Sequence, residues 1–141
     1  MKRNIKTIAV AVITLVSTVF YAHADSKPFK ELDSKEVVMN YVGATLLGSS
    51  EYTKELFADN FEYSNTANND KFGKKEYVNY LKSVKDLKYN STQTIEIVDQ
   101  VGSTSISKVT MDFGTFKRVD YITLIQSAEG WKINKVVTTY P

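Results

Sequence analysis

The stretch that decides the fold runs from Phe116 to Tyr140, near the end of the chain. It reads Phe-Lys-Arg-Val-Asp-Tyr-Ile-Thr-Leu-Ile-Gln over residues 116–126, Ser-Ala-Glu-Gly over 127–130, and Trp-Lys-Ile-Asn-Lys-Val-Val-Thr-Thr-Tyr over 131–140. Both arms are rich in β-branched and aromatic residues, and a four-residue loop that ends in glycine is typical of a hairpin. The pattern therefore predicts a β-hairpin, with Trp131 as its bulkiest candidate for the core.

Three further strands and three helices are expected ahead of this hairpin. Residues 92–100 and 104–113 alternate between apolar and polar side chains and are separated by turns that contain glycine, so with 116–126 and 131–140 they predict an antiparallel meander. Asp33 followed by Glu36 resembles a capping box and predicts a helix of about fourteen residues that ends at Gly48-Ser49-Ser50. A short helix over 51–57, a strand over 60–65, a loop over 66–72 and a helix over 74–85 complete the pattern.

Helices first and a meander afterwards predict an α+β fold in which one curved antiparallel sheet carries about three N-terminal helices on its concave face. The lysines of the segment 74–85, which include Lys75 and Lys82, are interpreted as a solvated helix face rather than an anion site.

The first 24 residues have the form of a signal peptide. Three basic residues precede an uncharged, mostly apolar run over 7–21, and Ala22-His23-Ala24 has the small-x-small form of a cleavage site. We expect export to the periplasm or the medium, cleavage near Ala24, and one domain over residues 25–141. The alternative, a permanent membrane anchor, is less favoured because the apolar run is shorter than the roughly 20 residues that a spanning helix needs.

Cleavage would change the charge and the available chemistry. The leader holds three of the 18 basic residues and none of the 16 acidic ones, so 15 basic and 16 acidic residues would remain. No basic run interleaved with aromatic residues survives, and nucleic acid is not an expected partner. His23 is the only histidine and the chain has no cysteine. The mature chain could not build a usual zinc site or a histidine-based nucleophile, so we expect no metal, no cofactor and no catalytic residues of those kinds.

The order of elements resembles the nuclear transport factor 2-like fold, which is also called cystatin-like. Val-Asp-Tyr-Ile-Thr-Leu-Ile over 119–125 and Glu-Gly-Trp-Lys-Ile-Asn-Lys over 129–135 are similar to the closing signature of the putative lumazine-binding family, a secreted, SnoaL-like branch of that superfamily. Segments 37–48 and 51–61 are similar to it as well. The resemblance implies a cone-shaped barrel with a pocket between the helices and the concave sheet, and it implies no reaction.

Candidate binding residues follow from which side chains share a strand face. Arg118, Asp120, Ile122 and Leu124 lie on one face of their strand. If Asp120 and Lys135 both point inward beside Trp131, they form a charged pair in a largely apolar pocket, where each charge needs a partner. The competing interpretation is a salt bridge at the rim that only fixes strand register.

Three tyrosines are further pocket candidates. Tyr41, Tyr63 and Tyr77 are either core aromatics or hydrogen-bonding groups for a flat heteroaromatic ligand.

Three functions remain open from the sequence. The first is an exported protein that binds a small, flat, partly apolar molecule, pterin- or flavin-like at best, without transforming it. The second is an interaction module that forms a homodimer through the outer sheet face, where Thr94, Glu96, Thr110 and Thr123 could lie. The third is an isomerase or cyclase that uses Asp and Tyr, as ketosteroid isomerase does. Asp59, Asp120, Tyr41 and Tyr63 supply those residue types but match no motif of that enzyme.

Overall fold

The computed structural model describes residues 12–15, 27–49 and 51–141. It contains two α-helices, one short 3-10 helix and seven strands, which in chain order are β1 (Val12–Leu15), η1 (Phe29–Glu31), α1 (Ser34–Leu46), β2 (Phe57–Asn65), β3 (Lys71–Gly73), α2 (Lys74–Ser83), β4 (Thr92–Val101), β5 (Thr104–Asp112), β6 (Lys117–Ser127) and β7 (Gly130–Thr139).

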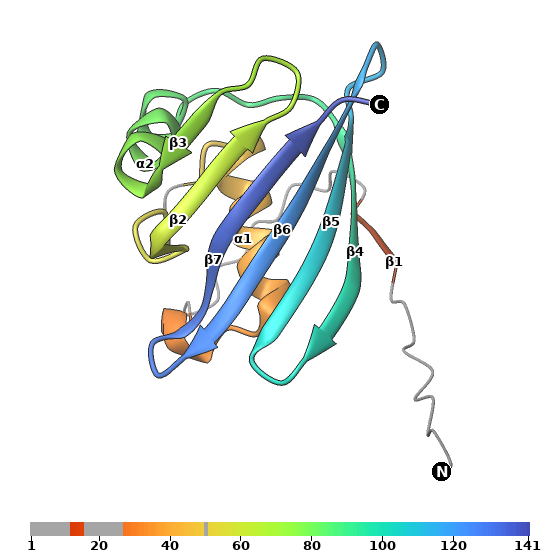
Figure 1. Cartoon of the computed structure of the whole chain (residues 1–141). Coiled ribbons are helices and arrows are strands. Elements are labelled where there is room, and N and C mark those ends of the chain that lie inside the picture. Colours follow the sequence, from red (N-terminus) through yellow and green to blue (C-terminus); the bar gives the residue numbers. More distant parts are fainter. Residues whose placement is uncertain (1–11, 16–26, 50) are drawn as a thin grey trace, which may run out of the picture.

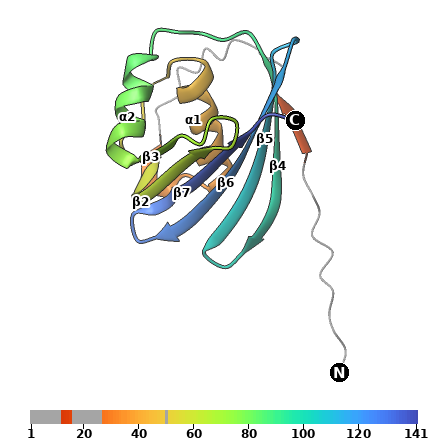
Figure 2. The same cartoon turned by 45° about the horizontal axis from the view of Figure 1, so that its top comes forward.

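The strands form one sheet in the order β1-β4-β5-β6-β7-β2-β3. β4 to β7 pair antiparallel with their sequence neighbours, so the predicted meander is confirmed, with each boundary within one residue of the prediction. β2 joins the far side of β7 in parallel and pairs antiparallel with β3. The sheet curves around the helices, as the turned view shows (Figure 2).

The hairpin between β6 and β7 is tighter than predicted. Ser127 pairs with Gly130, so only Ala128 and Glu129 form the turn. Gly130 has a φ of 98°, and a Cβ at this position would come within 2.8 Å of the Cα of Lys30. Glycine is therefore required here both by the backbone conformation and by the close approach of the chain before α1.

β1 pairs antiparallel with the outer edge of β4, with Val12 opposite Glu96 and Leu15 opposite Gln93. These four residues belong to the predicted leader. The rest of the leader, including the predicted cleavage site at residues 22–24, lies outside the described residues. Cleavage near Ala24 remains a prediction, and it would make β4 an edge strand.

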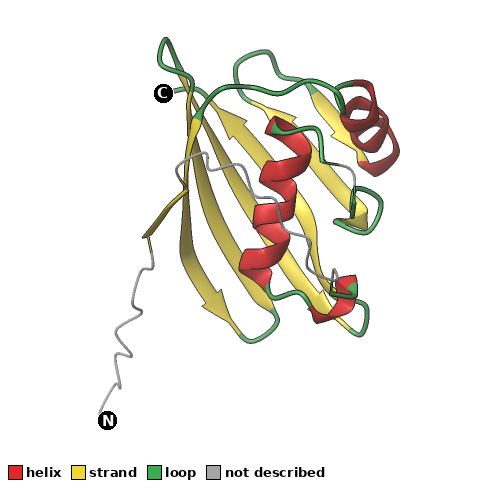
Figure 3. Cartoon of the chain, turned by 180° about the vertical axis from the view of Figure 1, so that it is seen from behind, coloured by secondary structure: helices red, strands yellow, loops and turns green. Residues whose placement is uncertain are grey.

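Helix α1 lies across the concave face of the sheet (Figure 3). Its start is the predicted capping box: the Glu36 N–H donates to Asp33 Oδ1 at 2.8 Å, and the Asp33 N–H donates to Glu36 Oε2 at 2.9 Å. Its end is stabilised by the Ser49 N–H, which donates to the Gly43 carbonyl at 3.1 Å after the chain reverses at Gly48. The buried residues of α1 face the sheet and include Val37, Val38, Tyr41, Val42 and Ala44.

Helix α2 lies beside β2 and β3 at one end of the sheet (Figure 1). It presents Tyr77, Val78 and Leu81 to the core and ends two residues earlier than predicted. The strand β3 falls partly within the predicted loop 66–72 and pairs with β2 through Tyr63 and Phe72.

The prediction of a short helix over 51–57 is wrong. Residues 51–55 form turns, in which the N–H groups of Glu55 and Leu56 both donate to the Tyr52 carbonyl. The chain cannot continue as a helix because Phe57 pairs with Ile133 of β7 and the Ile133 N–H donates to the Leu56 carbonyl at 2.8 Å. β2 therefore begins at Phe57 rather than at residue 60.

The core lies between the helices and the concave side of the sheet. Its largest fully buried side chains include Tyr41, Tyr77, Phe57, Met111 and Ile122, and Trp131 is 6% exposed. The α+β cone expected from the sequence is confirmed, with two α-helices and a 3-10 turn in place of about three helices. None of the helices in the described ranges is long and apolar enough to cross a membrane.

Candidate functional site

Among the described residues, Asp120 is the only charged residue that is buried, and its carboxylate lies in the middle of the sheet with no exposed surface. β6 places it between Val109 of β5 and Thr138 of β7. Four hydrogen bonds reach its two oxygens: Arg118 Nε at 2.9 Å and Thr138 Oγ1 at 2.7 Å donate to Oδ1, and Arg118 Nη2 at 2.9 Å and the Tyr41 hydroxyl at 2.7 Å donate to Oδ2. The carboxylate is thus fully satisfied as an acceptor.

Arg118 neutralises this buried charge. It precedes Asp120 by two residues on the same strand, so both side chains emerge on the concave face. Burial is the largest single influence and lowers the pKa of Arg118, but the Asp120 carboxylate and the nearby hydroxyls of Tyr41 and Tyr77 together outweigh it, so the pKa lies well above its ordinary value. The Arg118 side chain keeps 14% of its surface exposed. The pair is therefore a bidentate ion pair with one face toward solvent.

The pair with Asp120 uses only some of the hydrogen-bond donors of the Arg118 guanidinium. Within the described part of the chain its hydrogen bonds start from Nε and Nη2, the latter also reaching Thr138 Oγ1 at 3.3 Å and the Tyr41 hydroxyl at 3.4 Å. None of these bonds uses Nη1. An arginine has five N–H donors, so two remain on a nitrogen whose orientation is fixed by the other end of the fork.

The three candidate tyrosines gather around this pair. The hydroxyls of Tyr41 and Tyr77 lie 3.1 Å apart, and the ring of Tyr63 stacks on that of Tyr77 with 4.7 Å between centroids. Burial raises the pKa of Tyr41 well above its ordinary value, and the negative charge of Asp120 adds to the rise. Burial raises the pKa of Tyr77 as well. Both hydroxyls therefore stay protonated and serve as hydrogen-bond donors to the network.

Lys135 and Trp131 do not join this network. A register shift lies opposite Thr123 and Leu124, where β7 carries one extra residue, Asn134, between Ile133 and Lys135. The extra residue turns Lys135 outward, where it is exposed, and turns Val136 and Thr138 inward. The expected pairing of Lys135 with Asp120 does not form. Trp131 is buried in the core at the opposite end of β7 from Thr138.

Two members of the network were not predicted as site residues. Arg118 could have been identified, because its spacing from Asp120 already puts both on one strand face. Thr138 could not, because its inward orientation depends on the bulge at Asn134, which leaves no clear mark in the sequence.

A set of exposed aromatic side chains lies near Arg118, where β5 and β7 end and β4 and β6 begin. We call this set the aromatic end, and it comprises the exposed residues Tyr80, Tyr89, Phe116 and Tyr140 together with the half-buried Phe113. Phe113 stacks on Phe116 at 4.7 Å, Tyr89 meets Phe113 edge-on at 6.4 Å, and Phe116 lies 6.2 Å from Tyr140. Partial burial raises the pKa of Tyr80, and the positive charge of Arg118 opposes this rise, so the two groups are within electrostatic reach.

The interior of the cone is filled by side chains. Phe57 packs against Phe61 at 4.6 Å and against Tyr77 at 5.4 Å, and Tyr41 meets Phe57 edge-on. Three hollows lie at the surface instead, and none of them is lined by Tyr41, Tyr63, Tyr77, Asp120 or Trp131. The described residues also contain no group of three or more histidine, cysteine or acidic side chains that could hold a metal ion.

Comparison with solved structures identifies the fold. A nuclear transport factor 2-like protein of unknown function from Silicibacter pomeroyi matches with a TM-score of 0.62 at 15% identity, over 76% of this chain and 92% of that chain. A second such protein, from Methylobacillus flagellatus, matches with a TM-score of 0.61 at 19% identity, over 82% and 99% of the two chains. A ketosteroid isomerase-like protein from Erwinia carotovora atroseptica gives 0.60 at 15% identity, over 75% and 92%.

Comparison with protein families assigns the sequence more narrowly. None of the curated proteins compared with this chain is similar enough to count as a relative. The profile of the family described as putative lumazine-binding matches residues 31–139, which covers the chain from η1 to the end of β7. The chain therefore belongs to the putative lumazine-binding family, and it has the nuclear transport factor 2-like fold.

Proposed function

We propose that this protein is exported and binds a small, flat, partly apolar molecule at its aromatic end, where the free edge of Arg118 supplies hydrogen bonds. The family and the fold suggest a small-molecule-binding domain in general terms. One observation supports the specific site. Arg118, whose charge is neutralised by Asp120, keeps its Nη1 unused beside a set of mostly exposed aromatic rings.

The ion pair with Asp120 prepares Arg118 for such a role. Its two bonds to the carboxylate fix the plane of the guanidinium and cancel its charge, so a ligand would not have to bring a full negative charge. The carbonyl oxygens and ring nitrogens of a pterin or flavin are neutral acceptors that suit N–H donors whose directions are fixed in this way. The pre-oriented fork also loses little side-chain entropy when a ligand binds.

The aromatic end offers the apolar part of the site. Phe116 is 51% exposed and Tyr140 is 42% exposed, which leaves large ring surfaces in water. Aromatic rings favour offset stacking on a flat partner, and each such pair contributes about 0.5–1.5 kcal/mol beyond the area it buries. A ligand that covers these rings would remove apolar surface from water and meet Arg118 at its polar edge.

The location of the proposed site differs from the expectation of a chamber inside the cone. Because Tyr41, Tyr77 and Phe57 fill that space, the ligand is proposed to rest on the end of the cone. The buried tyrosines then act as support for Arg118 and Asp120. Tyr63, which is 7% exposed and stacks on both Tyr77 and Phe72, lies between the support and the surface.

A panel of lumazine, a pterin, riboflavin and FMN tests this proposal. A ligand of the right class should raise the melting temperature, and calorimetry should give one site per chain. Phe116→Ala and Tyr140→Ala should each weaken binding by about threefold to tenfold, because each removes one stacking partner. Val101→Ala, at a 70% exposed position in the opposite hairpin, is the matched control and should bind like the original protein. Equal affinities for all four proteins would contradict the proposed location.

Export is tested separately. Expression of the full chain in a bacterium should give a processed protein outside the cytoplasm, with a mass that corresponds to a start at Asp25. A variant in which Ala24 is replaced by tyrosine should accumulate as the precursor, because the cleavage site requires small residues. Recovery of unprocessed protein from the cytoplasm would contradict export without affecting the ligand proposal.

A homodimer through the outer sheet face is a second candidate, and one observation favours it. Ile106, Tyr121 and Ile125 are each between 37% and 42% exposed, and they alternate with the buried concave-facing residues on β5 and β6. Thr94, Glu96, Thr110 and Thr123 lie on the same face. A concentration-dependent dimer that is lost in Tyr121→Glu, measured by analytical ultracentrifugation, would support this candidate.

The isomerase alternative is less well supported. Asp120 accepts four hydrogen bonds and has no exposed surface, so it cannot reach a C–H bond of a bound ketone in this arrangement. Asp59 lies at the opposite extreme, with a fully exposed side chain paired only to Lys74.

A further inference from the structure

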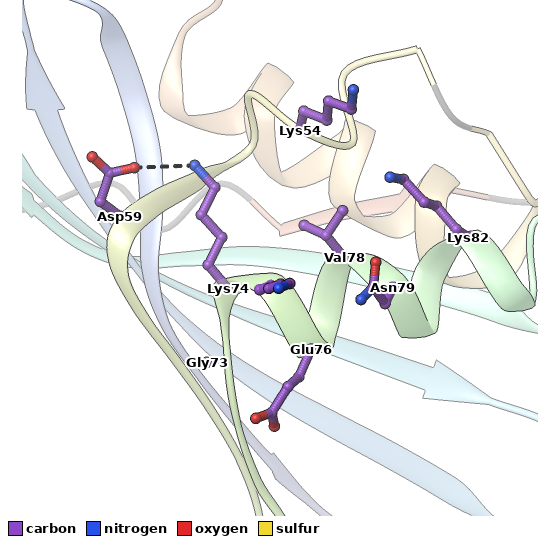
Figure 4. Close-up of a pocket in the computed structure, with 9 residues that line it drawn as sticks. Lys54, Asp59, Gly73, Lys74, Glu76, Val78, Asn79 and Lys82 are labelled. Carbon is purple, nitrogen blue, oxygen red and sulfur yellow. Dashed lines mark hydrogen bonds and ion pairs between the residues drawn. The ribbon is translucent and has the colours of Figure 1, made fainter.

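A hollow of about 740 Å³ lies on the outside of the molecule, between α2 and the segment that leads into β2 (Figure 4). We call it the lysine hollow, because four of its lining residues are lysines. Their positions, together with the two acidic residues of the hollow, are Lys54, Lys74, Lys75, Lys82, Asp59 and Glu76. The hollow shares no residue with the aromatic end or with the Arg118–Asp120 pair.

The cations of this hollow are mostly uncompensated. Lys74 pairs with Asp59 at 3.2 Å, whereas Lys54, Lys75 and Lys82 form no ion pair with any described residue. Glu76 points away from Lys54 and Lys82, which project over Val78 from two different segments (Figure 4). Like charges that line one concave surface add their fields and concentrate anions there.

A solvated helix face explains only part of this arrangement. Lys74, Lys75 and Lys82 all belong to α2, so their outward positions follow from the helical repeat. Lys54 comes from the turn before β2, well before α2 in the sequence, and it nevertheless lines the same hollow. The first turn of α2 also has no side-chain cap at Gly73, which lines the hollow, so backbone N–H groups add to the positive potential.

We propose that the lysine hollow is a second ligand site, which binds a small polyanion of the phosphate class. Its volume falls within the range of about 300–1,000 Å³ that is usual for small-molecule sites. Ammonium groups on flexible stems suit phosphate oxygens, which accept hydrogen bonds from several directions. A single negative charge would leave most of the lysines uncompensated, so the ligand carries at least two.

Neighbouring carboxylates limit the strength of the site. Glu51 and Glu55 line an adjoining hollow of about 180 Å³ that shares Lys54 and Lys82 with this one. Their negative charges oppose the positive field of Lys54 and Lys82, although they form no ion pair with these lysines. Replacing both by glutamine should therefore tighten anion binding.

The test is a titration of the folded protein with sodium pyrophosphate at low ionic strength, followed by ¹⁵N NMR and calorimetry. The amide signals of residue 54 and of residues 73–82 should shift in a saturable manner, and orthophosphate should bind more weakly. The double variant Lys54→Gln with Lys82→Gln should bind pyrophosphate about tenfold more weakly. The matched control, Lys30→Gln with Lys88→Gln, changes the net charge equally at exposed positions outside the hollow and should retain the affinity.

Two results would overturn the proposal. One is the absence of saturable shifts in the original protein, or shifts spread over lysines throughout the surface. The other is an equal loss of affinity in both double variants, which would indicate general attraction to a positively charged chain. Because the shift map uses the unmodified protein, a variant that fails to fold does not obscure the answer. A negative result for the lysine hollow would not affect the proposal for the aromatic end, because that proposal is tested separately with the variants Phe116→Ala and Tyr140→Ala.

Discussion

At the scale of single residues, Asp120 is the group on which the surrounding structure depends most. A buried carboxylate is costly unless every acceptor position is filled, and here Arg118, Thr138 and Tyr41 fill them. The pair is weak evidence for net stabilisation, because two apolar residues could replace it without loss. Removing one partner is different, since the other charge then stays buried alone.

Asp120→Asn should accordingly lower the free energy of unfolding by about 3–5 kcal/mol. Urea denaturation followed through the single tryptophan, Trp131, measures this change. The matched control is Glu129→Gln, which removes the exposed pair with Lys132 and should cost about 1 kcal/mol or less. If the two variants lose the same stability, the buried ion pair is not formed in solution.

The buried tyrosines predict a loss of stability at alkaline pH. Burial raises the pKa of Tyr41 and Tyr77 above the value of the unfolded chain, so above about pH 10 the folded state holds protons that the unfolded state releases. Each tyrosine then lowers the free energy of unfolding by about 1.4 kcal/mol for every pH unit. Below the pKa of the unfolded chain, the tyrosine is protonated in both states and its full contribution to the stability of the folded state is retained.

Tyr77→Phe is the variant that isolates this effect, because the one hydrogen bond of the Tyr77 hydroxyl within the described part of the chain is to the Tyr41 hydroxyl. Urea denaturation at pH 8, 10 and 11 should show a shallower alkaline decline in Tyr77→Phe than in the original protein. Lysines titrate in both proteins and cancel in the comparison. Identical pH profiles would mean that Tyr77 is accessible to solvent.

At the scale of elements, the end of α1 requires glycine at position 48. Gly48 has a φ of 66°, and a Cβ there would overlap the carbonyl oxygen of Lys85. Gly102 has a similar φ of 57° but no atom within 4 Å of a built Cβ. Gly102→Ala should therefore cost only the backbone strain, about 1–2 kcal/mol, whereas Gly48→Ala should cost clearly more because the chain beyond α2 must move. Equal losses in thermal or urea unfolding would contradict this contact.

The positions of helices and strands could be predicted from the sequence wherever apolar side chains repeat with one constant period over a whole segment. The meander strands and the Asp33–Glu36 start of α1 follow directly from alternation and capping chemistry. The inward orientation considered for Lys135 is wrong because a single extra residue, Asn134, reverses the alternation of inward and outward side chains in β7. The segment 51–57 was misplaced because its local preference for a helical turn yields to the pairing of Phe57 with Ile133.

At the scale of the whole molecule, aromatic side chains pack the interior of the cone, and the groups proposed to bind ligands lie at its surface. Aromatic side chains that the sequence presented as pocket residues instead pack the interior and hold Arg118 and Asp120 in place. Family membership fixed the cone but could not distinguish a hollow cone from a filled one, because that depends on how Phe57, Phe61 and Tyr77 interlock. We therefore propose ligand binding at the end of the cone and, independently, at the lysine hollow.

The central claim is that the free edge of Arg118 contacts a ligand held by the aromatic end. Arg118 is the only arginine beyond Arg3, so its side-chain N–H signals can be assigned in a ¹⁵N NMR spectrum of the processed protein without ambiguity. On titration with the ligand that gives the largest thermal shift among lumazine, the pterin, riboflavin and FMN, those signals should shift together with those of Phe116 and Tyr140. Binding that leaves the Arg118 signals unchanged would contradict the claim.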